Sequence, residues 1–327
     1  MIQNRNVIAL TGPTGAIGMA LIKCCLERNM EVIAIVNPNS KRKERLKQFS
    51  GLHVIECDME KYCELDLCRE LKNEMHIRTT EEFTCDIWIH LAWMSASGMG
   101  RNDVFVQNRN VTFLLDAMDA ANRAGCHTFL GAGSQAEYGL QSEDIGEFSE
   151  TKPFTGYGIA KLCAGQLGRI RAQQLGIRFL WTRICSVYGP YDGENTMLIS
   201  AIDSLLKGDV PEFTKGEQIW DYLYSEDAAN MLMKLVDYGK DGRIYVIGSG
   251  TKKPLSQYIE CMKYTVEQVI GRNVTISIGT RPYGENQVMY LCANLQAFLE
   301  DTGEFAFTSY EEGIRNTVIW CEKQLAD

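Results

Sequence analysis

The sequence predicts an α/β fold, a doubly wound parallel sheet with a smaller, interleaved C-terminal lobe. Short β-rich runs alternate with longer helical patterns through the first half of the chain. A glycine-rich turn joins the first β-rich run to the first helical pattern. The alternation loosens after residues 188–190, where loops become frequent.

The first three elements are the clearest. Val7–Thr11 is an almost continuous apolar run, as expected for a strand covered on both faces. Ala16–Glu27 repeats apolar residues at helical spacing, and Glu31–Val36 reads as a second strand. Ser40 is placed to cap a basic helix that follows. Further strands are expected over Leu52–Cys57, Asp86–His90, His127–Ala132 and Arg178–Cys185, and further helices near Glu60–Glu74, Asn102–Ala124 and Gly158–Gln174.

The second half of the chain divides less regularly. A helix near Glu226–Tyr238 and a strand near Arg243–Ile247 are expected to rejoin the first sheet. Residues 1–190, together with about 225–248, would then form the larger domain. Residues 191–224 and 249–327 would form the smaller lobe, which we expect to bind a substrate.

Composition disfavours several classes of protein. The 327 residues carry 33 Lys plus Arg against 42 Asp plus Glu, a net charge of −9, which disfavours nucleic acid and anionic membranes as partners. No apolar run approaches the ~20 residues of a membrane span, and the first is too short for a signal peptide. The 12 cysteines form no Cys-x-x-Cys pair and the four histidines are scattered, so we expect neither a disulfide framework nor a metal site. These features indicate a reduced, cytoplasmic protein.

The glycine-rich turn has the spacing of a dinucleotide-binding fingerprint. Gly12, Gly15 and Gly18 stand three residues apart between a strand and a helix. The first suits a tight turn, the second a close approach to a pyrophosphate, and the third close packing of the helix on the sheet. The helix would offer the phosphates its unpaired N–H groups. The residues expected to bind the dinucleotide here are Gly12, Thr14, Gly15, Ala16, Ile17 and Gly18.

The residues after the second strand bear on the choice between NAD and NADP. An acidic residue there would bind the ribose 2′-hydroxyl of NAD and repel the 2′-phosphate of NADP. The chain has no acid at this point and carries Asn37, Ser40, Lys41 and Arg42. This pattern favours NADP and leaves NAD open, because basic residues are equally typical of a solvated helix face. After the third strand, Asp58 could accept a hydrogen bond from the adenine amine, although an aspartate in a loop at a strand end is common; its neighbour Met59 is also expected to bind the cofactor.

Two further positions can carry proton chemistry. Tyr157 and Lys161 are four residues apart on an expected helix and share one face. A nearby ammonium lowers the pKa of a tyrosine, so that its phenol can exchange a proton with a carbonyl or alcohol near neutral pH. Ser134 lies just beyond the end of an expected strand, where ligands bind in open α/β sheets, and its hydroxyl can hydrogen-bond a substrate oxygen.

Together these stretches resemble the extended short-chain dehydrogenase/reductase family, in its nucleotide-sugar epimerase, dehydratase and reductase branch. The resemblance covers nearly the whole chain and implies a Rossmann fold. The matching stretches are Thr11-Gly12-x-x-Gly15-x-x-Gly18, His90-Leu91-Ala92, Asn110-Val111, Ser134 with Tyr138-Gly139, Tyr157-x-x-x-Lys161, Arg183 with Tyr188-Gly189-Pro190, and Trp220-Asp221-Tyr222 leading to Asp227.

The resemblance implies roles for the matching residues. Tyr157 would be the general acid/base, and Lys161 would hold the nicotinamide ribose. Ser134 would be the partner of the substrate oxygen, and Asn110 would support the lysine through water. The residues implied to line the cofactor are Leu91, Ala92 and Trp93. The region after Cys185 would meet the sugar. The substrate would also contact Gln135, Trp220 and the diphosphate-gripping Arg281, for which a surface turn residue is the alternative.

Two departures from the family pattern narrow the expected chemistry. Dehydratases of the family place an Asp-Glu pair directly after this serine or threonine, and Gln135-Ala136 stands there instead, which disfavours dehydration. Trp220 occupies the place of a phosphate-binding arginine in many relatives, which points to base stacking or to a different nucleotide. The stretches around these two positions, Gly133-Ser134-Gln135-Ala136-Glu137-Tyr138-Gly139 and Gln218-Ile219-Trp220-Asp221-Tyr222, resemble those of 4-ketoreductases that make CDP- or dTDP-linked 6-deoxyhexoses.

The leading expectation is therefore NAD(P)H-dependent reduction of a 4-keto nucleotide-linked sugar, with Tyr157 as proton donor. The alternatives are a 4-epimerase that keeps NAD tightly bound and a non-catalytic nucleotide-binding regulatory protein. The resemblance also implies a homodimer in which two long helices of each subunit form a bundle. Its apolar contacts would come from Val104, Leu114, Leu115, Met118, Leu162 and Leu167. The same residues could equally form ordinary faces that cover the sheet.

Overall fold

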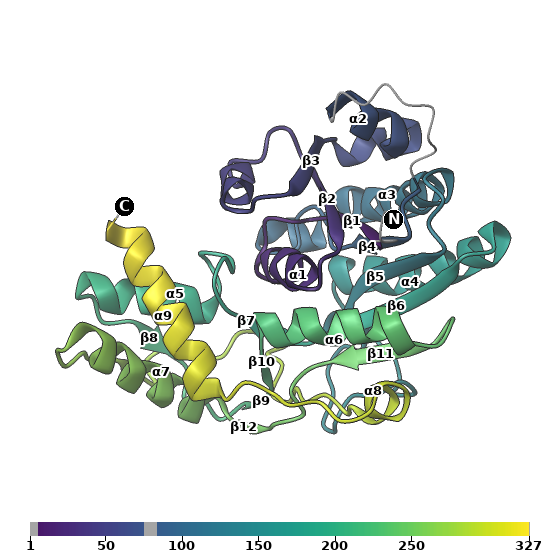
Figure 1. Cartoon of the computed structure of the whole chain (residues 1–327). Helices are drawn as coiled ribbons and strands as arrows, with labels where there is room; N and C mark the ends of the chain where they lie inside the picture. Colours follow the sequence, from purple (N-terminus) through teal and green to yellow (C-terminus); the bar gives the residue numbers. More distant parts are fainter. Residues whose placement is uncertain (1–5, 75–83, 327) are drawn as a thin grey trace.

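The computed structural model describes residues 6–74 and 84–326. Its centre is a parallel sheet with the strand order β11-β6-β5-β4-β1-β2-β3 (Figure 1). The strands are β1 (Val7–Thr11), β2 (Glu31–Val36), β3 (Leu52–Glu56), β4 (Ile87–His90), β5 (Thr128–Ser134), β6 (Arg178–Ile184) and β11 (Ile244–Ile247). The chain leaves β1 in one direction toward β2 and β3 and later returns to its other side with β4. Ligands bind at such a switch point in open α/β sheets.

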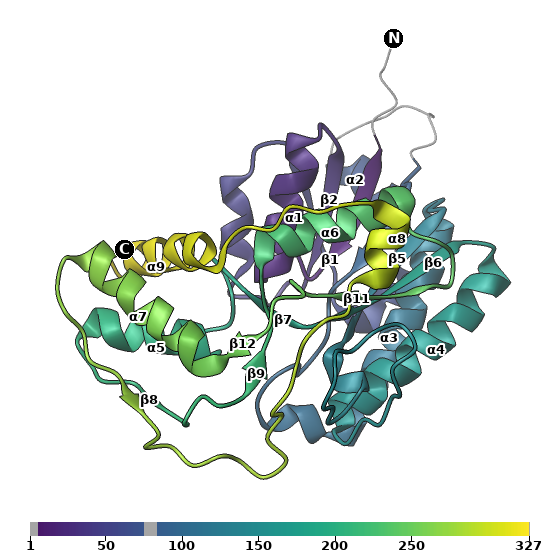
Figure 2. The same ribbon diagram turned by 90° about the horizontal axis from the view of Figure 1, so that it is seen from below.

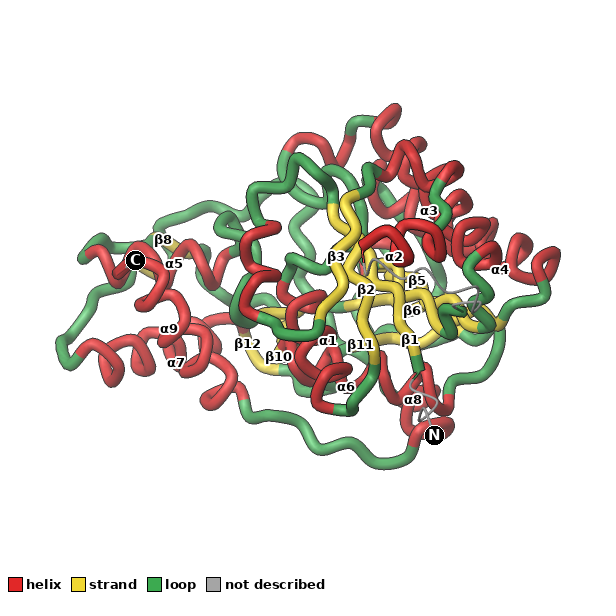
Figure 3. Tube along the Cα trace, turned by 45° about the horizontal axis from the view of Figure 1, so that its top comes forward, coloured by secondary structure: helices red, strands yellow, loops and turns green. Residues whose placement is uncertain are grey.

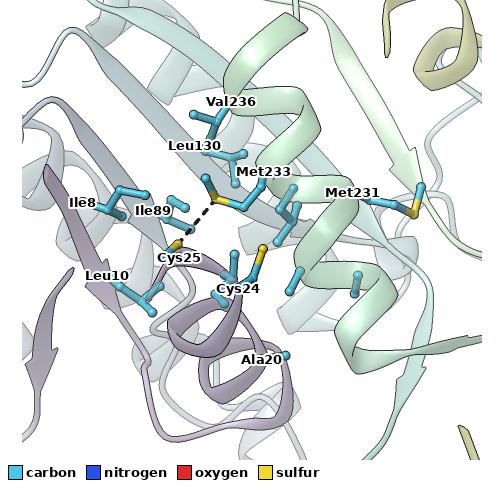
Figure 4. Close-up of a cluster of buried hydrophobic side chains, with 14 of the residues drawn as sticks. Ile8, Leu10, Ala20, Cys24, Cys25, Ile89, Leu130, Met231, Met233 and Val236 are labelled. Carbon is cyan, nitrogen blue, oxygen red and sulfur yellow. Dashed lines mark hydrogen bonds between the residues drawn. The ribbon is translucent and has the colours of Figure 1, made fainter. Parts of the chain in front are cut away.

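Helices cover both faces of this sheet (Figure 2). α3 (Val104–Arg123) and α4 (Gly156–Leu175) pack on one face, where they share a core with Ala9, Trp88 and Phe129. α1 (Ala16–Glu27) and α6 (Ser225–Tyr238) pack on the other face. Figure 4 shows this second core, in which Cys25 lies 3.7 Å from the Met233 sulfur. The alternation of strand residues between two apolar faces confirms the predicted doubly wound fold.

The predicted bounds of β1, α1 and β2 are confirmed residue by residue. The helix expected near Glu60–Glu74 is interrupted, because Asp58 caps a short 3-10 helix, η2 (Met59–Glu64), and Asp66 accepts a hydrogen bond from Arg69 N at the start of α2 (Leu67–Glu74). The expected basic helix is also a short 3-10 helix, η1 (Lys43–Gln48). Ser40 does not cap it: the Ser40 hydroxyl accepts a hydrogen bond from Arg42 N and closes the turn before the helix.

The smaller lobe is built from α5 (Met197–Lys207), α7 (Leu255–Ile270) and α9 (Tyr310–Ala326), which stand apart from the sheet at one end (Figure 3). They share their own apolar core. The remaining short elements are η3 (Met99–Asn102), η4 (Gln135–Glu137), β7 (Ser186–Tyr188), β8 (Glu212–Phe213), β9 (Ile219–Trp220), β10 (Tyr222–Tyr224), β12 (Lys253–Pro254), β13 (Ser277–Ile278) and α8 (Gln296–Thr302).

The chain passes from the sheet into the smaller lobe and then returns to the sheet. α6 and β11 return to the sheet as predicted, and β11 pairs with β6. α8, within the segment assigned to the lobe, packs on α6 and β11 through Phe298. The division into a cofactor domain and a substrate lobe stays a prediction.

The described residues contain neither a helix that could span a membrane nor a group that could hold a metal ion. No helix within 6–74 and 84–326 is both long and apolar enough to cross a bilayer. In the same ranges, no cluster of three or more His, Cys, Asp or Glu side chains could hold a metal ion. His76 lies outside them.

Candidate active site

A cleft of about 380 Å³ opens at the carboxyl ends of β1, β4, β5 and β6, beside the switch point of the sheet. We call it the central cleft. The sequence-predicted residues that line it are Gly12, Gly15, Ala16, Ile17, Gly18, Leu91, Trp93, Ser134, Tyr157 and Lys161. It therefore joins the glycine turn to the residues with proton chemistry, although about 145 positions separate them in the sequence.

The glycine turn is shaped for a ligand. Gly12 has a φ of +70°, and a Cβ atom there would lie 2.9 Å from Ala92 N. A Cβ at Gly18 would collide with the Gly12 carbonyl. A Cβ at Gly15 would meet no atom within 4 Å, because Gly15 faces the open central cleft. No side chain caps the first turn of α1, so its N–H groups stay available to a pyrophosphate. These features fit a dinucleotide.

Replacing Gly15 by Val is expected to weaken NAD(P) binding at least about tenfold, since a lost hydrogen bond to a charged group is worth ~1.5–3 kcal/mol. Gly15 has an extended backbone that valine adopts easily, so the melting temperature of the free protein should barely change. Titration calorimetry checks the affinity. Gly284→Val is the matched control, because the nearest atom there is Gln287 Oε1 at 3.9 Å. Unchanged cofactor affinity in Gly15→Val would contradict the assignment.

The residues predicted for the adenosine end lie beside the glycine turn, outside the lining of the central cleft. Asn37 Nδ2 donates to Asp58 Oδ2 at 2.9 Å, which joins the ends of β2 and β3. Arg45, which the sequence did not single out, donates to the carbonyls of Thr14 (3.0 Å) and Tyr191 (3.3 Å). Arg45 thereby ties the glycine turn to the loop that enters the lobe. The other predicted members of this group are Ser40, Lys41, Arg42 and Met59, of which Lys41 and Arg42 are exposed.

Lys161 is buried at the inner wall of the central cleft. Its ammonium donates to Ala132 O at 2.5 Å and lies 3.7 Å from the centroid of the Trp93 ring. Burial lowers the pKa of Lys161 to about 7, against the opposing effect of Glu137. The distance from Nζ to the Tyr157 ring centroid is 5.8 Å.

The pKa of Tyr157 is shifted in the direction opposite to the one expected from the sequence. Burial raises the pKa of the Tyr157 phenol, and the Ser134 side chain and Arg101 lower it by less. Lys161 does not produce the predicted lowering of the pKa, because its ammonium is turned toward Ala132 and Trp93. Ser134 and Tyr157 nevertheless interact in the same part of the cleft, which suits transfer of a proton to an oxygen held by Ser134.

The lowered pKa of Lys161 predicts a pH dependence of folding. The unfolded chain keeps this proton up to the ordinary pKa of 10.5, while the folded protein loses it near pH 7. Stability should therefore rise as pH increases from about 7 toward 10.5. Lys161→Met is expected to flatten this rise in urea unfolding at pH 7, 8 and 9, and the exposed Lys207→Met should not. An equal slope in wild type and Lys161→Met would show that Lys161 is not the group responsible.

Two side chains of α3 hold the loop after β4. Asn110 accepts a hydrogen bond from Met94 N (2.8 Å) and donates to Met94 O (3.0 Å) in this loop and to Gln107 Oε1 (3.4 Å) on the same helix. Gln107 accepts from Trp93 Nε1 at 2.9 Å and donates to two loop carbonyls. Gln107 was not predicted, although its spacing of three from Asn110 places both residues on one helix face.

A buried charge cluster lies behind Ser134. Glu137 is fully buried; its carboxylate accepts from Ser134 N (2.9 Å), Arg183 Nε (2.7 Å) and Trp181 Nε1 (3.2 Å). A Cβ at Gly131 would lie 2.6 Å from the Trp181 ring, so glycine makes room for the indole. This cluster fixes the backbone that carries the serine. Ser134 and Glu137 form a capping box, a spacing that is visible in the sequence and could have indicated Glu137.

The residues predicted for the substrate are more dispersed. Gln135 follows Ser134 in η4 but does not line the central cleft. Trp220 packs against the cluster that contains Cys185, a lining residue, and its Nε1 is buried with no partner among the described residues. Arg281 is exposed on the loop after β13, outside the central cleft. Asp192, which was not predicted, lines the central cleft.

A doubly wound sheet with a glycine turn and a Ser, Tyr and Lys set in one cleft defines the short-chain dehydrogenase/reductase class of dinucleotide-dependent enzymes. The model of the NAD dependent epimerase/dehydratase family matches residues 8–248. The chain belongs to this family, as the sequence predicted.

Individual relatives are distant and extend over most of the chain. dTDP-glucose 4,6-dehydratase 1 of Escherichia coli K12 is 22% identical over 96% of this chain and 92% of its own. CDP-abequose synthase of Salmonella typhimurium LT2 is 24% identical over 89% of this chain and 90% of its own. UDP-glucuronic acid 4-epimerase from Bacillus cereus, solved with UDP-glucuronic acid and NAD, is 19% identical and covers 98% of this chain and 99% of its own, with a TM-score of 0.78.

Proposed function

We propose that this protein reduces a 4-keto sugar linked to a nucleotide, with NAD(P)H as reductant. One observation carries the proposal: Ser134, Tyr157 and Lys161 line the same cleft as the glycine turn. A bound nicotinamide would supply the hydride for the ketone carbon. Once the carbon has received the hydride, the oxygen needs one proton to become an alcohol. The protein therefore has to supply that proton and hold the oxygen that receives it.

The protein's own groups suit these two tasks. The Ser134 hydroxyl would donate a hydrogen bond to the ketone oxygen, and the Tyr157 phenol would give its proton to that oxygen as negative charge develops. Glu137 holds the Ser134 backbone, so the serine needs little reorganisation. Leu91, Trp93 and Cys185 line the same space with apolar surface and would exclude water.

Reduction is favoured over dehydration by the residues next to Ser134. Gln135 and Ala136 provide neither an acid nor a base for the elimination of water. A 4-epimerase is the second candidate, supported by the likeness in fold to the B. cereus epimerase. A protein purified with tightly held NAD and showing no net cofactor oxidation during turnover would favour the epimerase.

The proposal includes a preference for NADP. The turn after β2 carries Asn37, Ser40, Lys41 and Arg42 and has no acidic residue to repel a 2′-phosphate. The exposed Lys41 and Arg42 are free to turn toward a phosphate. Affinities for NADPH and NADH, measured in wild type and in a Lys41→Gln/Arg42→Gln double variant, test this preference. Equal affinities in the wild type would contradict this preference, and tighter binding of NADH would assign NAD instead.

The proposed function is tested with a panel of cofactors and nucleotide sugars. Ligands that bind only the folded protein raise its melting temperature by mass action, so thermal shift identifies the cofactor and the nucleotide. Cofactor oxidation with 4-keto CDP- and dTDP-sugars then measures the reaction. Binding of NADP(H) without turnover of any sugar would favour a regulatory nucleotide-binding protein.

We also propose a homodimer through α3 and α4, with corrected contacts. Leu114 and Met118 are fully buried against the sheet and are not available to a partner. Val104 and Leu167 are 62% and 40% exposed, and Leu115 and Leu162 are half-buried. Light scattering that reports a dimer would support this assembly, and a monomer at working concentration would contradict it.

A cytoplasmic location completes the proposal. All 12 cysteines are free thiols, as expected in a reducing compartment. Burial raises the pKa of the Cys25 thiol to about 12, so Cys25 serves as a core side chain rather than a reactive thiol.

A further inference from the structure

A second cation stacks on the proposed proton donor. The Cζ atom of Arg101, in η3, lies 4.4 Å from the centroid of the Tyr157 ring. Arg101 Nη1 donates to Ala96 O at 3.2 Å, and Ala96 lines the central cleft. Asn102 Oδ1 accepts from Gly156 N at 2.9 Å, which ties η3 to the residue before Tyr157. The guanidinium is therefore held by the loop before η3, and the end of η3 is held by the start of α4.

Arg101 is closer to the Tyr157 ring than Lys161 is. Lys161 Nζ lies 5.8 Å from the ring centroid and is engaged by Ala132 O and the Trp93 indole. Trp93 packs edge-on against Tyr157, with ring centroids 6.1 Å apart. The two aromatic rings thus lie between two cations, in the order Arg101, Tyr157, Trp93 and Lys161.

We propose that Arg101 is a positioning residue that orients the Tyr157 ring and favours the phenolate formed when the substrate oxygen takes the proton. A guanidinium is attracted to the face of a neutral ring, and the attraction grows when the ring becomes anionic. Stabilising that anion lowers the cost of giving up the proton during reduction. This role rests on the proposed function.

The charged groups around Tyr157 come from three elements. Arg101 of η3 lowers the pKa of the phenol and Glu137 of η4 raises it. The Glu137 carboxylate is already paired with Arg183, and Lys161 of α4 is turned away. Among the charged groups, Arg101 is accordingly the one whose removal should change the ionisation of Tyr157 most directly.

The test is a difference titration that follows tyrosinate absorbance in the near ultraviolet. Wild type minus Tyr157→Phe isolates the ionisation of Tyr157, and Arg101→Gln minus the Arg101→Gln/Tyr157→Phe double variant isolates it without the guanidinium. We expect the midpoint to rise by roughly 0.5–1 pH unit in Arg101→Gln. Arg101→Lys, which keeps the charge but stacks less well, should fall between Arg101→Gln and the wild type.

Arg109→Gln is the matched control, because Arg109 also lies over an aromatic ring, but that ring belongs to Phe113, at 5.4 Å, and not to Tyr157. An unchanged midpoint in Arg101→Gln, or an equal rise in Arg109→Gln, would overturn the proposal. The titration needs neither cofactor nor substrate, so it is decided separately from the proposed function. In an active enzyme, the alkaline limb of kcat/KM should move up with the midpoint.

Discussion

Tyr157→Phe is expected to lower turnover of a 4-keto nucleotide sugar by about 10²–10⁴-fold, the usual contribution of a positioned proton donor. The phenylalanine keeps the contacts of the ring with Trp93 and Arg101 and loses only the hydroxyl. Cofactor affinity should therefore change less than about tenfold, the limit for one lost neutral hydrogen bond. Steady-state kinetics and cofactor titration check the two parts of this prediction.

Tyr264→Phe is the control for this variant, because Tyr264 is 61% exposed on α7, outside the central cleft. It should retain full turnover. If Tyr157→Phe were as active as Tyr264→Phe, Tyr157 would have no part in the mechanism.

Glu137→Gln is expected to destabilise the protein by about 3–5 kcal/mol, the usual cost of removing one partner from a buried ion pair. Arg183 is 4% exposed, so its guanidinium would remain buried without a countercharge. The same change weakens the hold on Ser134 N, and we expect lower turnover in the molecules that stay folded. Urea unfolding measures the first effect and kinetics at low temperature the second.

The control is Glu150→Gln, whose partner Lys152 and own carboxylate are both 69% exposed. A surface pair of this kind is worth ~0–1 kcal/mol. Comparable losses of stability in the two variants would mean that the buried cluster behind Ser134 has no special role.

The sequence predicted the local features of the site. Gly12, Gly15 and Gly18 are recognised by their spacing between a strand and a helix, and Tyr157 and Lys161 by a spacing of four. Both patterns lie within a few residues of the chain, so they can be recognised without knowledge of tertiary contacts. The β11 strand could likewise be assigned to the sheet from its apolar run.

Contacts between distant residues were beyond such patterns. Arg101 and Tyr157 are 56 positions apart, and Glu137 and Arg183 are 46 apart, so only the fold brings each pair together. The burial of the Tyr157 phenol could not be predicted from these patterns either. It raises the pKa of Tyr157 against the expected effect of Lys161.

The apolar spacing along α3 also gives no information on what each face of the helix contacts. The spacing of its apolar residues indicates a helix but does not separate the face that covers the sheet from a face that meets a partner. Both environments were therefore left open for Leu114 and Met118, and their burial places them on the face that covers the sheet.

The most direct test of the central claim is a single turnover with NAD(P)H that carries deuterium at the transferable position of its nicotinamide. The proposed reaction predicts that the deuterium appears on C4 of the product sugar and that an equal amount of cofactor is oxidised. A reduced sugar without deuterium, or conversion of the sugar with the cofactor unchanged, would contradict it.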